Sequence, residues 1–336
     1  MAVLSSIEGL SSSMASCMFV KLPIPEGDLS QETIVVTGSN QGLGFEASRH
    51  FLRLGVHRLI MAVRNMKKGE AARLELLQLT GRDPSTIEVW ELDMDSYTSV
   101  KNFAARAKTL PRLDALLANA GLATETFEMV EDNERTITVN VVSTFLLVIL
   151  LIPKLRESAQ RYSKNTRVSI VNSALHYIAP LSEIEGDGTS DIFSRLNDER
   201  TAQMGLRYPL SKLLVLFGVR ALADRLCKEE PLVILNAPNP SWCKSQLMRE
   251  NESFGVRVGE RFIARSTEMG SRALVHGILS GPESSGQYID NCQIKRPSCI
   301  VTSQNGTTIE KAFFKELIGK IEKISPGTTV AFGLNE

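Results

Sequence analysis

The chain has 336 residues, of which 43% are hydrophobic and 23% are charged, as in an ordinary soluble globular protein. Its 38 basic and 38 acidic side chains cancel, so no overall field attracts nucleic acid or anionic lipid, and we expect neither as a partner. The five cysteines lack the paired short spacings of a zinc site or a disulfide framework. We therefore expect reduced thiols, no metal and a cytoplasmic protein.

The first 21 residues are rich in serine and lack the basic start and long apolar run of a signal peptide, so we interpret residues 1–21 as a mobile leader. The most hydrophobic stretch, "VVSTFLLVILLI" at residues 141–152, precedes Pro153 and is too short to span a bilayer. A buried helix is the better interpretation. No repeat or linker divides the remainder, so residues 22–336 are expected to form one domain.

Short β-branched or apolar runs alternate with helical patterns along the chain. Strands are predicted at residues 33–36, 58–63, 87–92, 113–118, 167–172, 232–236 and 286–290. Helices are predicted at residues 45–55, 67–79, 100–108 and 141–152. This alternation indicates right-handed βαβ crossovers. The fold class is α/β: a single-domain, Rossmann-like, doubly wound parallel sheet of about seven strands with helices on both faces.

The stretch "TGSNQGLG", residues 37–44, lies where the first strand becomes a helix. Gly38, Gly42 and Gly44 would let the backbone turn sharply and approach a pyrophosphate, which the N–H groups of the helix N-terminus attract. The alternative is a tight turn without a ligand. No Lys-Ser/Thr pair follows the glycines, which argues against an ATP-type P-loop.

In "YPLSK", Tyr208 and Lys212 are four residues apart and would share one face of a helix. A nearby ammonium lowers the pKa of a phenol, which tunes it to exchange a proton with a carbonyl oxygen. Pro209 is compatible with a helix that starts at Tyr208, and that start would place the tyrosine at the exposed mouth of a site. The alternative is an ordinary surface pair.

These motifs and four others resemble the short-chain dehydrogenase/reductase family. In order, they are "TGSNQGLG", "LDM", "ANAG", "TVNVVS", "SIVNSA" and "YPLSK", and the resemblance covers residues 33–250. A closer resemblance, to a fungal subgroup often encoded with secondary-metabolite pathways, is carried by "LPIPEG", "EDNERTITVNVVSTFLL", "DIFSRLND", "GPESSGQYIDNCQI" and "ELIGKIEKISPG". It implies a ketoreductase that acts on a small organic, polyketide- or terpenoid-like substrate.

The resemblance also implies a role for each site residue. Tyr208 would transfer the proton and Ser173 would hold the substrate oxygen. Asn140 would hold a water that relays protons to Lys212, which would also bind the nicotinamide ribose. Asp93 would bind adenine. The full set of expected cofactor contacts is Gly38, Ser39, Asn40, Gln41, Gly42, Leu43, Gly44, Arg64, Asp93, Asn119, Ala120, Gly121, Tyr208, Lys212 and Pro240.

Arg64 decides the expected cofactor. It follows the second strand in "MAVRN", where no acidic residue is present to bind a ribose 2′-hydroxyl, whereas an arginine suits a 2′-phosphate. We therefore predict NADP(H); a solvated arginine is the alternative. For the function as a whole, the alternatives are alcohol oxidation, a cofactor-bound enzyme that does no redox chemistry, and a nucleotide-sensing protein.

The chain departs from the family in three places. Residues 174–207 form a long insertion before Tyr208, in which His176 is interpreted as a hydrogen-bonding loop residue. Ser241 replaces the glycine of the family's Pro-Gly pair, in a substrate loop expected at about residues 238–260. The helices that carry residues 146–152 and 208–212 have apolar surface to spare, which favours a homodimer.

Overall fold

One eight-stranded sheet organises the chain. The computed structural model describes residues 2–186, 191–226, 232–244 and 264–329. The strands are β1 (Thr33–Thr37), β2 (Arg58–Val63), β3 (Ile87–Glu91), β4 (Ala115–Ala118), β7 (Thr166–Ile170), β8 (Val233–Asn239), β9 (Tyr288–Asp290) and β10 (Gln293–Lys295). They lie in the order β10-β9-β8-β7-β4-β1-β2-β3, parallel except for β10. This doubly wound order confirms the predicted fold class.

The sheet has one strand more than the sequence predicts. β10 pairs antiparallel with β9 through a hairpin whose turn residues, Asn291 and Cys292, both have positive φ, 53° and 58°. A two-residue turn with both residues in the left-handed region has a twist that matches the twist of the two strands it joins. All three residues of β10 are exposed, so it carries no apolar alternation that sequence reasoning could detect.

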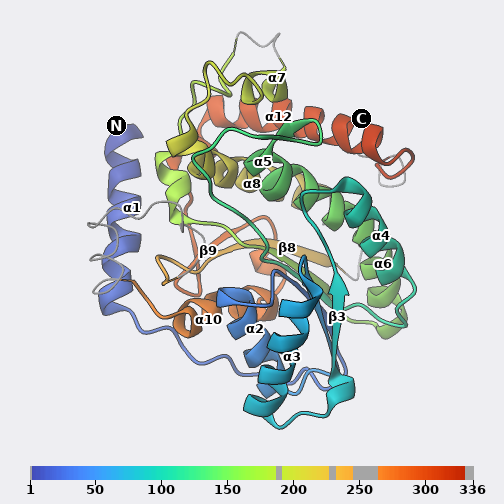
Figure 1. Ribbon diagram of the computed structural model, residues 1–336. Helices are drawn as coiled ribbons and strands as arrows, with labels where there is room; N and C mark the ends of the chain where they lie inside the picture. Colours follow the sequence, from blue (N-terminus) through green and yellow to red (C-terminus); the bar gives the residue numbers. More distant parts are fainter. Residues whose placement is uncertain (1, 187–190, 227–231, 245–263, 330–336) are drawn as a thin grey trace.

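Helices cover both faces of the sheet (Figure 1). One face carries α2 (Gly42–Arg53), α3 (Met66–Thr80) and α10 (Thr267–Leu279). The other carries α4 (Tyr97–Lys108), α6 (Thr144–Tyr162) and α8 (Met204–Leu226), and α12 (Gln304–Ile324) packs on α8. The shorter elements are η1 (Pro84–Thr86), β5 (Met129–Val130), β6 (Asn133–Glu134), α5 (Arg135–Ile137), η2 (Thr138–Ser143), η3 (Ala174–Ile178), α7 (Ile192–Leu196), η5 (Pro282–Ser284) and α11 (Cys299–Thr302).

The predicted helix at residues 141–152 is longer than expected, because α6 continues through Pro153 to Tyr162. Together with α5 and η2, it makes a continuous helical stretch, Arg135–Tyr162, that is long and apolar enough to cross a membrane by length and composition alone. However, 94% of its most apolar window is buried inside the protein. It is therefore a buried core helix, as the sequence predicts.

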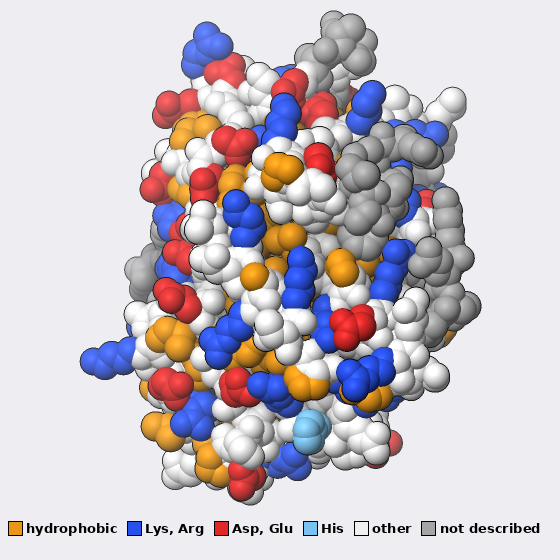
Figure 2. Space-filling view, turned by 90° about the vertical axis from the view of Figure 1, so that its right-hand side faces the viewer, with side chains coloured by type: hydrophobic (Ala, Val, Ile, Leu, Met, Phe, Trp, Pro, Cys, Tyr) orange, Lys and Arg blue, Asp and Glu red, His pale blue; other side chains and the backbone are white. Residues whose placement is uncertain are grey.

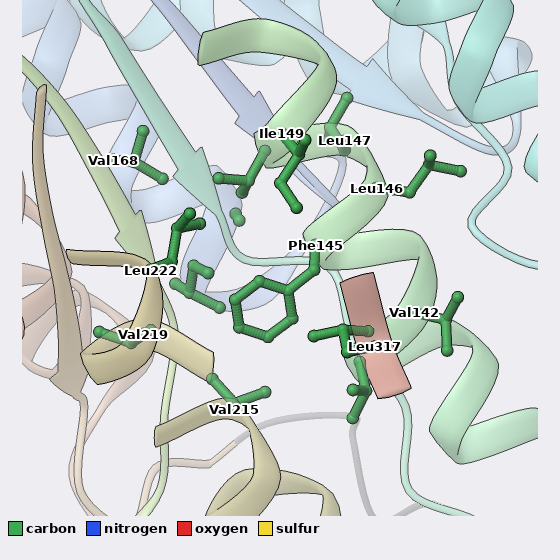
Figure 3. Close-up of a cluster of buried hydrophobic side chains, with 14 of the residues drawn as sticks. Val142, Phe145, Leu146, Leu147, Ile149, Val168, Val215, Val219, Leu222 and Leu317 are labelled. Atoms are coloured by element: carbon green, nitrogen blue, oxygen red, sulfur yellow. The ribbon is translucent and has the colours of Figure 1, made fainter. Parts of the chain in front are cut away.

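The apolar side chains of α6 are buried within this chain. Figure 3 shows Phe145 and Ile149 facing Val219 and Leu222 of α8, with Leu317 of α12 beside them. α6 and α8 cross closely, since a Cβ at Gly218 would overlap the Phe145 ring. The homodimer stays a prediction, but residues 146–152 no longer support it, because other parts of the same chain cover their apolar surface.

The leader expected at residues 1–21 forms a helix, α1 (Ala2–Phe19), over most of its length. In Figure 1 it lies along the side of the molecule, next to η3. Its serine-rich sequence has no strong amphipathic pattern, so its place in the fold depends on contacts with distant residues, which are described below.

Acidic and basic side chains are interspersed on the face shown in Figure 2, where α4 and α6 lie. This distribution agrees with the balanced charge of the sequence and offers no extended surface of one sign on that face.

Candidate active site

The glycine loop between β1 and α2 has the conformation of a phosphate-binding turn. Gly38 and Gly42 have φ of 64° and 60°, in the left-handed region that favours glycine. A Cβ at Gly44 would lie 2.5 Å from the carbonyl oxygen of Gly38, so only glycine lets α2 approach β1 this closely. Each of the three predicted glycines is therefore required by the backbone.

The start of α2 also suits an anion. The N-cap residue, Gln41, makes no side-chain capping hydrogen bond, and the first turn holds no acidic residue. The hydroxyl of Ser39 is buried and has no hydrogen-bond partner among the described residues. An uncapped helix N-terminus next to an unpartnered buried hydroxyl fits the pyrophosphate of a dinucleotide.

Asn119 and Ala120 brace this loop from the end of β4. The side-chain amide of Asn119 donates to the carbonyl oxygen of Thr37 at 2.9 Å. The backbone N–H groups of Asn119 and Ala120 both donate to the Thr37 hydroxyl, at 3.0 and 2.8 Å. These bonds fix the ends of β1 and β4 at the point where the strand order reverses, which is the usual ligand crevice of such sheets.

Ser173, Tyr208 and Lys212 converge at the ends of β7 and α8. The hydroxyl groups of Ser173 and Tyr208 are hydrogen-bonded to each other. The Ser173 hydroxyl also accepts a hydrogen bond from the backbone N–H of Leu175, at 3.2 Å, as the cap of η3. The ammonium of Lys212 donates to the carbonyl oxygen of Val171 at 2.8 Å and lies 5.4 Å from the centre of the Tyr208 ring.

The helix that carries Tyr208 does not start where Pro209 suggested. α8 begins at Met204, so Pro209 lies inside it and Tyr208 is half-buried rather than at an exposed mouth. Pro209 is the sixth residue of α8, past its first turn, so the helix lacks the hydrogen bond that an N–H at this position would donate to the carbonyl of Gly205. Pro209 itself is buried.

Burial governs the acidity of both groups. It raises the pKa of Tyr208 well above 10, and only the hydrogen bond with Ser173 lowers it. This direction is opposite to the expected one, because desolvation outweighs the hydrogen bond with Ser173. Burial also lowers the pKa of Lys212 to about 8. Tyr208 is therefore a protonated phenol at neutral pH and can donate a proton.

Asn140 lies in η2, a single π-helical segment within the long apolar helix. Its side-chain oxygen accepts from the backbone N–H of Leu122 at 2.9 Å, and its amide group donates to the Leu122 carbonyl oxygen and to the Ser211 hydroxyl, at 2.9 and 3.0 Å. π-helical turns of this kind occur mostly at functional sites. Asn140 joins the loop after β4 to the helix that carries Lys212.

A single cavity of about 820 Å³ collects most of the predicted residues. Those that line it are Gly38, Asn40, Gln41, Gly42, Leu43, Arg64, Asp93, Asn119, Ala120, Gly121, Ser173, Tyr208, Lys212 and Pro240. Ser39, Gly44 and Asn140 do not line it. The part of the predicted substrate loop at residues 245–260 lies outside the described residues.

Arg64 lies at the far end of this cavity, and the sequence does not reveal its partner. Its guanidinium is 3.1 Å from the carboxylate of Asp95, and 64% of its side chain is exposed. Asp95 is held more tightly by Arg135, at 2.7 and 3.0 Å. Lys68 also lines this end. An exposed arginine with a shared counter-ion is able to turn toward a phosphate.

The insertion, residues 174–207, is anchored by two buried groups. Within it, His176 accepts the backbone N–H of Ser298 on Nε2, at 3.1 Å, so Nδ1 carries the proton and donates to the Ser173 carbonyl oxygen, at 2.7 Å. It thus acts as a hydrogen-bonding residue. The guanidinium of Arg207 is fully buried and lies 2.8 Å from Glu183 and 3.6 Å from Glu134.

Four further residues of this site are not predicted, or only partly predicted, from the sequence. Ser241 has a φ of 64°, the left-handed conformation that the family's glycine would adopt without strain. Trp242 and Cys243 also line the cavity; burial raises the pKa of Cys243 to about 12, so it is not a nucleophile. Leu10, from the N-terminal helix, lines it too. Among the described residues, no cluster of metal-ligating side chains occurs.

Comparison with known proteins identifies the family of this chain. Residues 32–174 match the family model described as short chain dehydrogenase. The chain is 42% identical to the short chain dehydrogenase/reductase dmxR8 of Cryptosporiopsis sp. over 94% of this chain and 98% of that protein. It is 40% identical to the short-chain dehydrogenase anuD of Penicillium roqueforti, over 93% and 83%.

Solved structures share the fold. An uncharacterised protein from Mycobacterium Paratuberculosis superposes with a TM-score of 0.66 at 23% identity, over 89% of this chain and 94% of its own. A short chain dehydrogenase from Escherichia coli CFT073, complexed with NADPH, superposes with a TM-score of 0.59 at 22% identity, over 80% and 99%. From the sequence relatives and the fold together, the chain belongs to the short-chain dehydrogenase family, with its similar relatives in fungi.

Proposed function

We propose that this protein is an NADP(H)-dependent ketoreductase of a small organic substrate, of the polyketide or terpenoid kind. The observation that carries the proposal is the convergence of Ser173, Tyr208 and Lys212 in the same cavity as the uncapped glycine loop. One end of the cavity suits a dinucleotide phosphate and the other offers a proton donor and an oxygen-binding hydroxyl. A cytoplasmic location is also proposed, which the burial of the apolar helix supports.

When bound, NADPH would supply a hydride from nicotinamide C4 to the carbonyl carbon of the substrate. Tyr208 would donate its phenolic proton to the carbonyl oxygen, and the Ser173 hydroxyl would donate a hydrogen bond to that oxygen as negative charge develops on it. The product is the alcohol, and Tyr208 then regains its proton from solvent. Because the pKa of the phenol lies well above neutral pH, Tyr208 enters the reaction protonated, as reduction requires of a proton donor.

Lys212 and Asn140 would support these two groups. The ammonium of Lys212 is fixed by the Val171 carbonyl beside the Tyr208 ring, where its charge would stabilise a phenolate as the proton leaves. Asn140 holds the Lys212 helix in place through Ser211. Arg64, freed from Asp95, would pair with a ribose 2′-phosphate.

The test is a fluorescence titration of the protein with NADPH and, separately, NADH, followed by ketone reduction monitored through NADPH consumption. We expect tighter NADPH binding and turnover that is lost in Tyr208→Phe. Tighter NADH binding would contradict the assignment of Arg64. Absence of binding by either nucleotide would contradict the enzyme assignment.

A further inference from the structure

The N-terminal helix α1 has one face built against the catalytic domain. Gly9, Leu10, Ser13, Ser16 and Cys17 are buried or half-buried, at the three- and four-residue spacing of one helix face. Ser11, Ser12 and Ala15, on the opposite side, are exposed. The buried face is made of small side chains except for Leu10, so the helix can approach the domain closely while one large side chain projects inward.

Specific contacts hold this face in register. At one end, Gly9 lies flat against the ring of Tyr177, where a Cβ would come within 2.5 Å of the ring carbons. Tyr177 is itself fixed by a 2.8 Å hydrogen bond from its hydroxyl to the Arg296 carbonyl oxygen. Any larger side chain at position 9 would push the helix away from the domain.

At the other end, Arg265 caps α1. Its buried guanidinium donates to the carbonyl oxygens of Ser16 and Val20, at 2.9 and 3.1 Å, and to the side chain of Asn291 at 2.7 Å. A cation at the carbonyl end of a helix also interacts favourably with the helix dipole. The same guanidinium donates to the Ser241 hydroxyl at 3.0 Å, so α1 is tied directly to the loop after β8.

Two side chains on the buried face of α1 reach the active-site cavity. Leu10 and Ser13 both line it, together with Leu122, Leu175 and Trp242. The Ser13 hydroxyl accepts a hydrogen bond from Asn239, the residue before Pro240, at 3.4 Å. The helix therefore closes the cavity at the end where Ser173 and Pro240 lie.

The end of the cavity that α1 closes is the substrate end under the proposed function. Arg64 follows β2, whereas Asn239 ends β8, and the strand order places four inter-strand steps between them. At ~4.8 Å a step, these ends are roughly 19 Å apart, too far for α1 to reach the 2′-phosphate. Side chains from α1 can affect the substrate without affecting the phosphate end of the cofactor site.

We propose that α1 forms a wall of the substrate compartment, and that Leu10 and Ser13 help to select a carbonyl compound with an apolar body. This inference rests on the proposed ketoreductase function and extends it. The lining supports the substrate class, because Leu10, Leu122, Leu175 and Trp242 are apolar and Ser13 adds one hydroxyl at the edge.

The test compares the same change at a buried and at an exposed position of α1. Ser13→Leu fills the cavity, and Ser12→Leu, on the exposed face, is its matched control. Leu10→Ala enlarges the same wall. For each variant we would measure the Kd for NADPH, and kcat/KM for acetophenone, 1-tetralone and 9-fluorenone, which increase in size. Ligand-observed NMR of the NADPH complex would report binding of each ketone even where turnover is slow.

We expect Ser13→Leu to lower kcat/KM for 9-fluorenone relative to acetophenone by about tenfold or more, since one or two methylene groups in a pocket have effects of this size. Leu10→Ala should shift the ratio the other way. Ser12→Leu should match the wild type, and all variants should keep its Kd for NADPH, which also shows that they fold.

The inference would be overturned if Ser13→Leu and Leu10→Ala gave the size preference and ketone binding of Ser12→Leu. If the wild type binds NADPH and reduces ketones in that case, only the role of α1 fails. If the wild type binds neither NADPH nor any ketone, the proposed function fails and the inference fails with it.

Discussion

His176 makes the stability of this protein sensitive to acid. Its imidazole is fully buried between the rings of Tyr177 and Tyr288, and it joins the Ser173 carbonyl to the backbone N–H of Ser298. Protonation of Nε2 would remove the acceptor of the Ser298 N–H and would place two N–H groups against each other. Burial lowers the pKa of His176 from 6.5 to about 4, which the hydrogen bond to Ser173 only partly offsets.

Because the pKa of His176 is lowered in the folded protein, acid destabilises the fold. The folded protein binds the proton less readily than the unfolded chain, so the stability due to neutral His176 is complete above pH 6.5 and is lost as the pH falls toward 4. Between pH 8 and pH 5, the two pKa values give a loss of about 2 kcal/mol. That loss is a substantial part of the ~5–15 kcal/mol that stabilises a typical domain.

The assay is urea denaturation of the wild type and of His176→Gln at pH 8 and at pH 5. Other groups titrate in both proteins, so the informative quantity is the difference between their pH dependences. We expect the wild type to lose about 2 kcal/mol more than His176→Gln. The exposed His57 provides a control, His57→Gln, which should behave as the wild type does. An equal loss in wild type and His176→Gln would refute the reasoning.

Four further predictions concern the site and its supports. Tyr208→Phe should lower kcat by about 10²–10⁴-fold with an unchanged Kd for NADPH, measured by stopped-flow and fluorescence. Arg64→Ala should weaken NADPH binding by roughly tenfold or more and leave NADH binding unchanged in the same titration. Ketone reduction should decrease as the pH rises through about 8, because Lys212 then loses its proton, and the pH profile of kcat/KM checks this. Arg207→Met leaves the buried carboxylate of Glu183 without its counter-ion and should cost about 3–5 kcal/mol in urea denaturation.

Most of the fold could be predicted because its signals are local. A strand buried on both faces needs a continuous apolar run, and β2 was located at its observed bounds for that reason. Gly81, with a φ of 64°, is the C-cap of α3, which ends one residue past its predicted end. Pro153 and Pro209 were misleading, because tertiary packing holds both inside helices that the local rule would end.

The residues proposed to take part in catalysis could also be predicted from local motifs. Parallel strands bring their carboxyl ends to one edge of the sheet, so a motif that directly follows a strand is placed there whatever the loops do. Ser173 follows β7, and Asn119 follows β4. The motifs did not predict the direction of the pKa shift of Tyr208. That shift depends on the burial of the phenol, which the spacing between Tyr208 and Lys212 does not indicate.

The substrate end is different, because it is assembled from segments that meet only in the folded protein. Leu10 comes from the N-terminal helix and Leu175 from the insertion, whereas Trp242 follows β8. No periodicity or motif in any of these segments indicates that it contacts the others. Arg265 and His176 then fix them through contacts with residues far away in the sequence, Ser16 and Ser298 respectively. Under the proposed function, a change in these segments would alter the substrate compartment, whereas Ser173 and Tyr208 would keep the positions that the sheet and α8 give them.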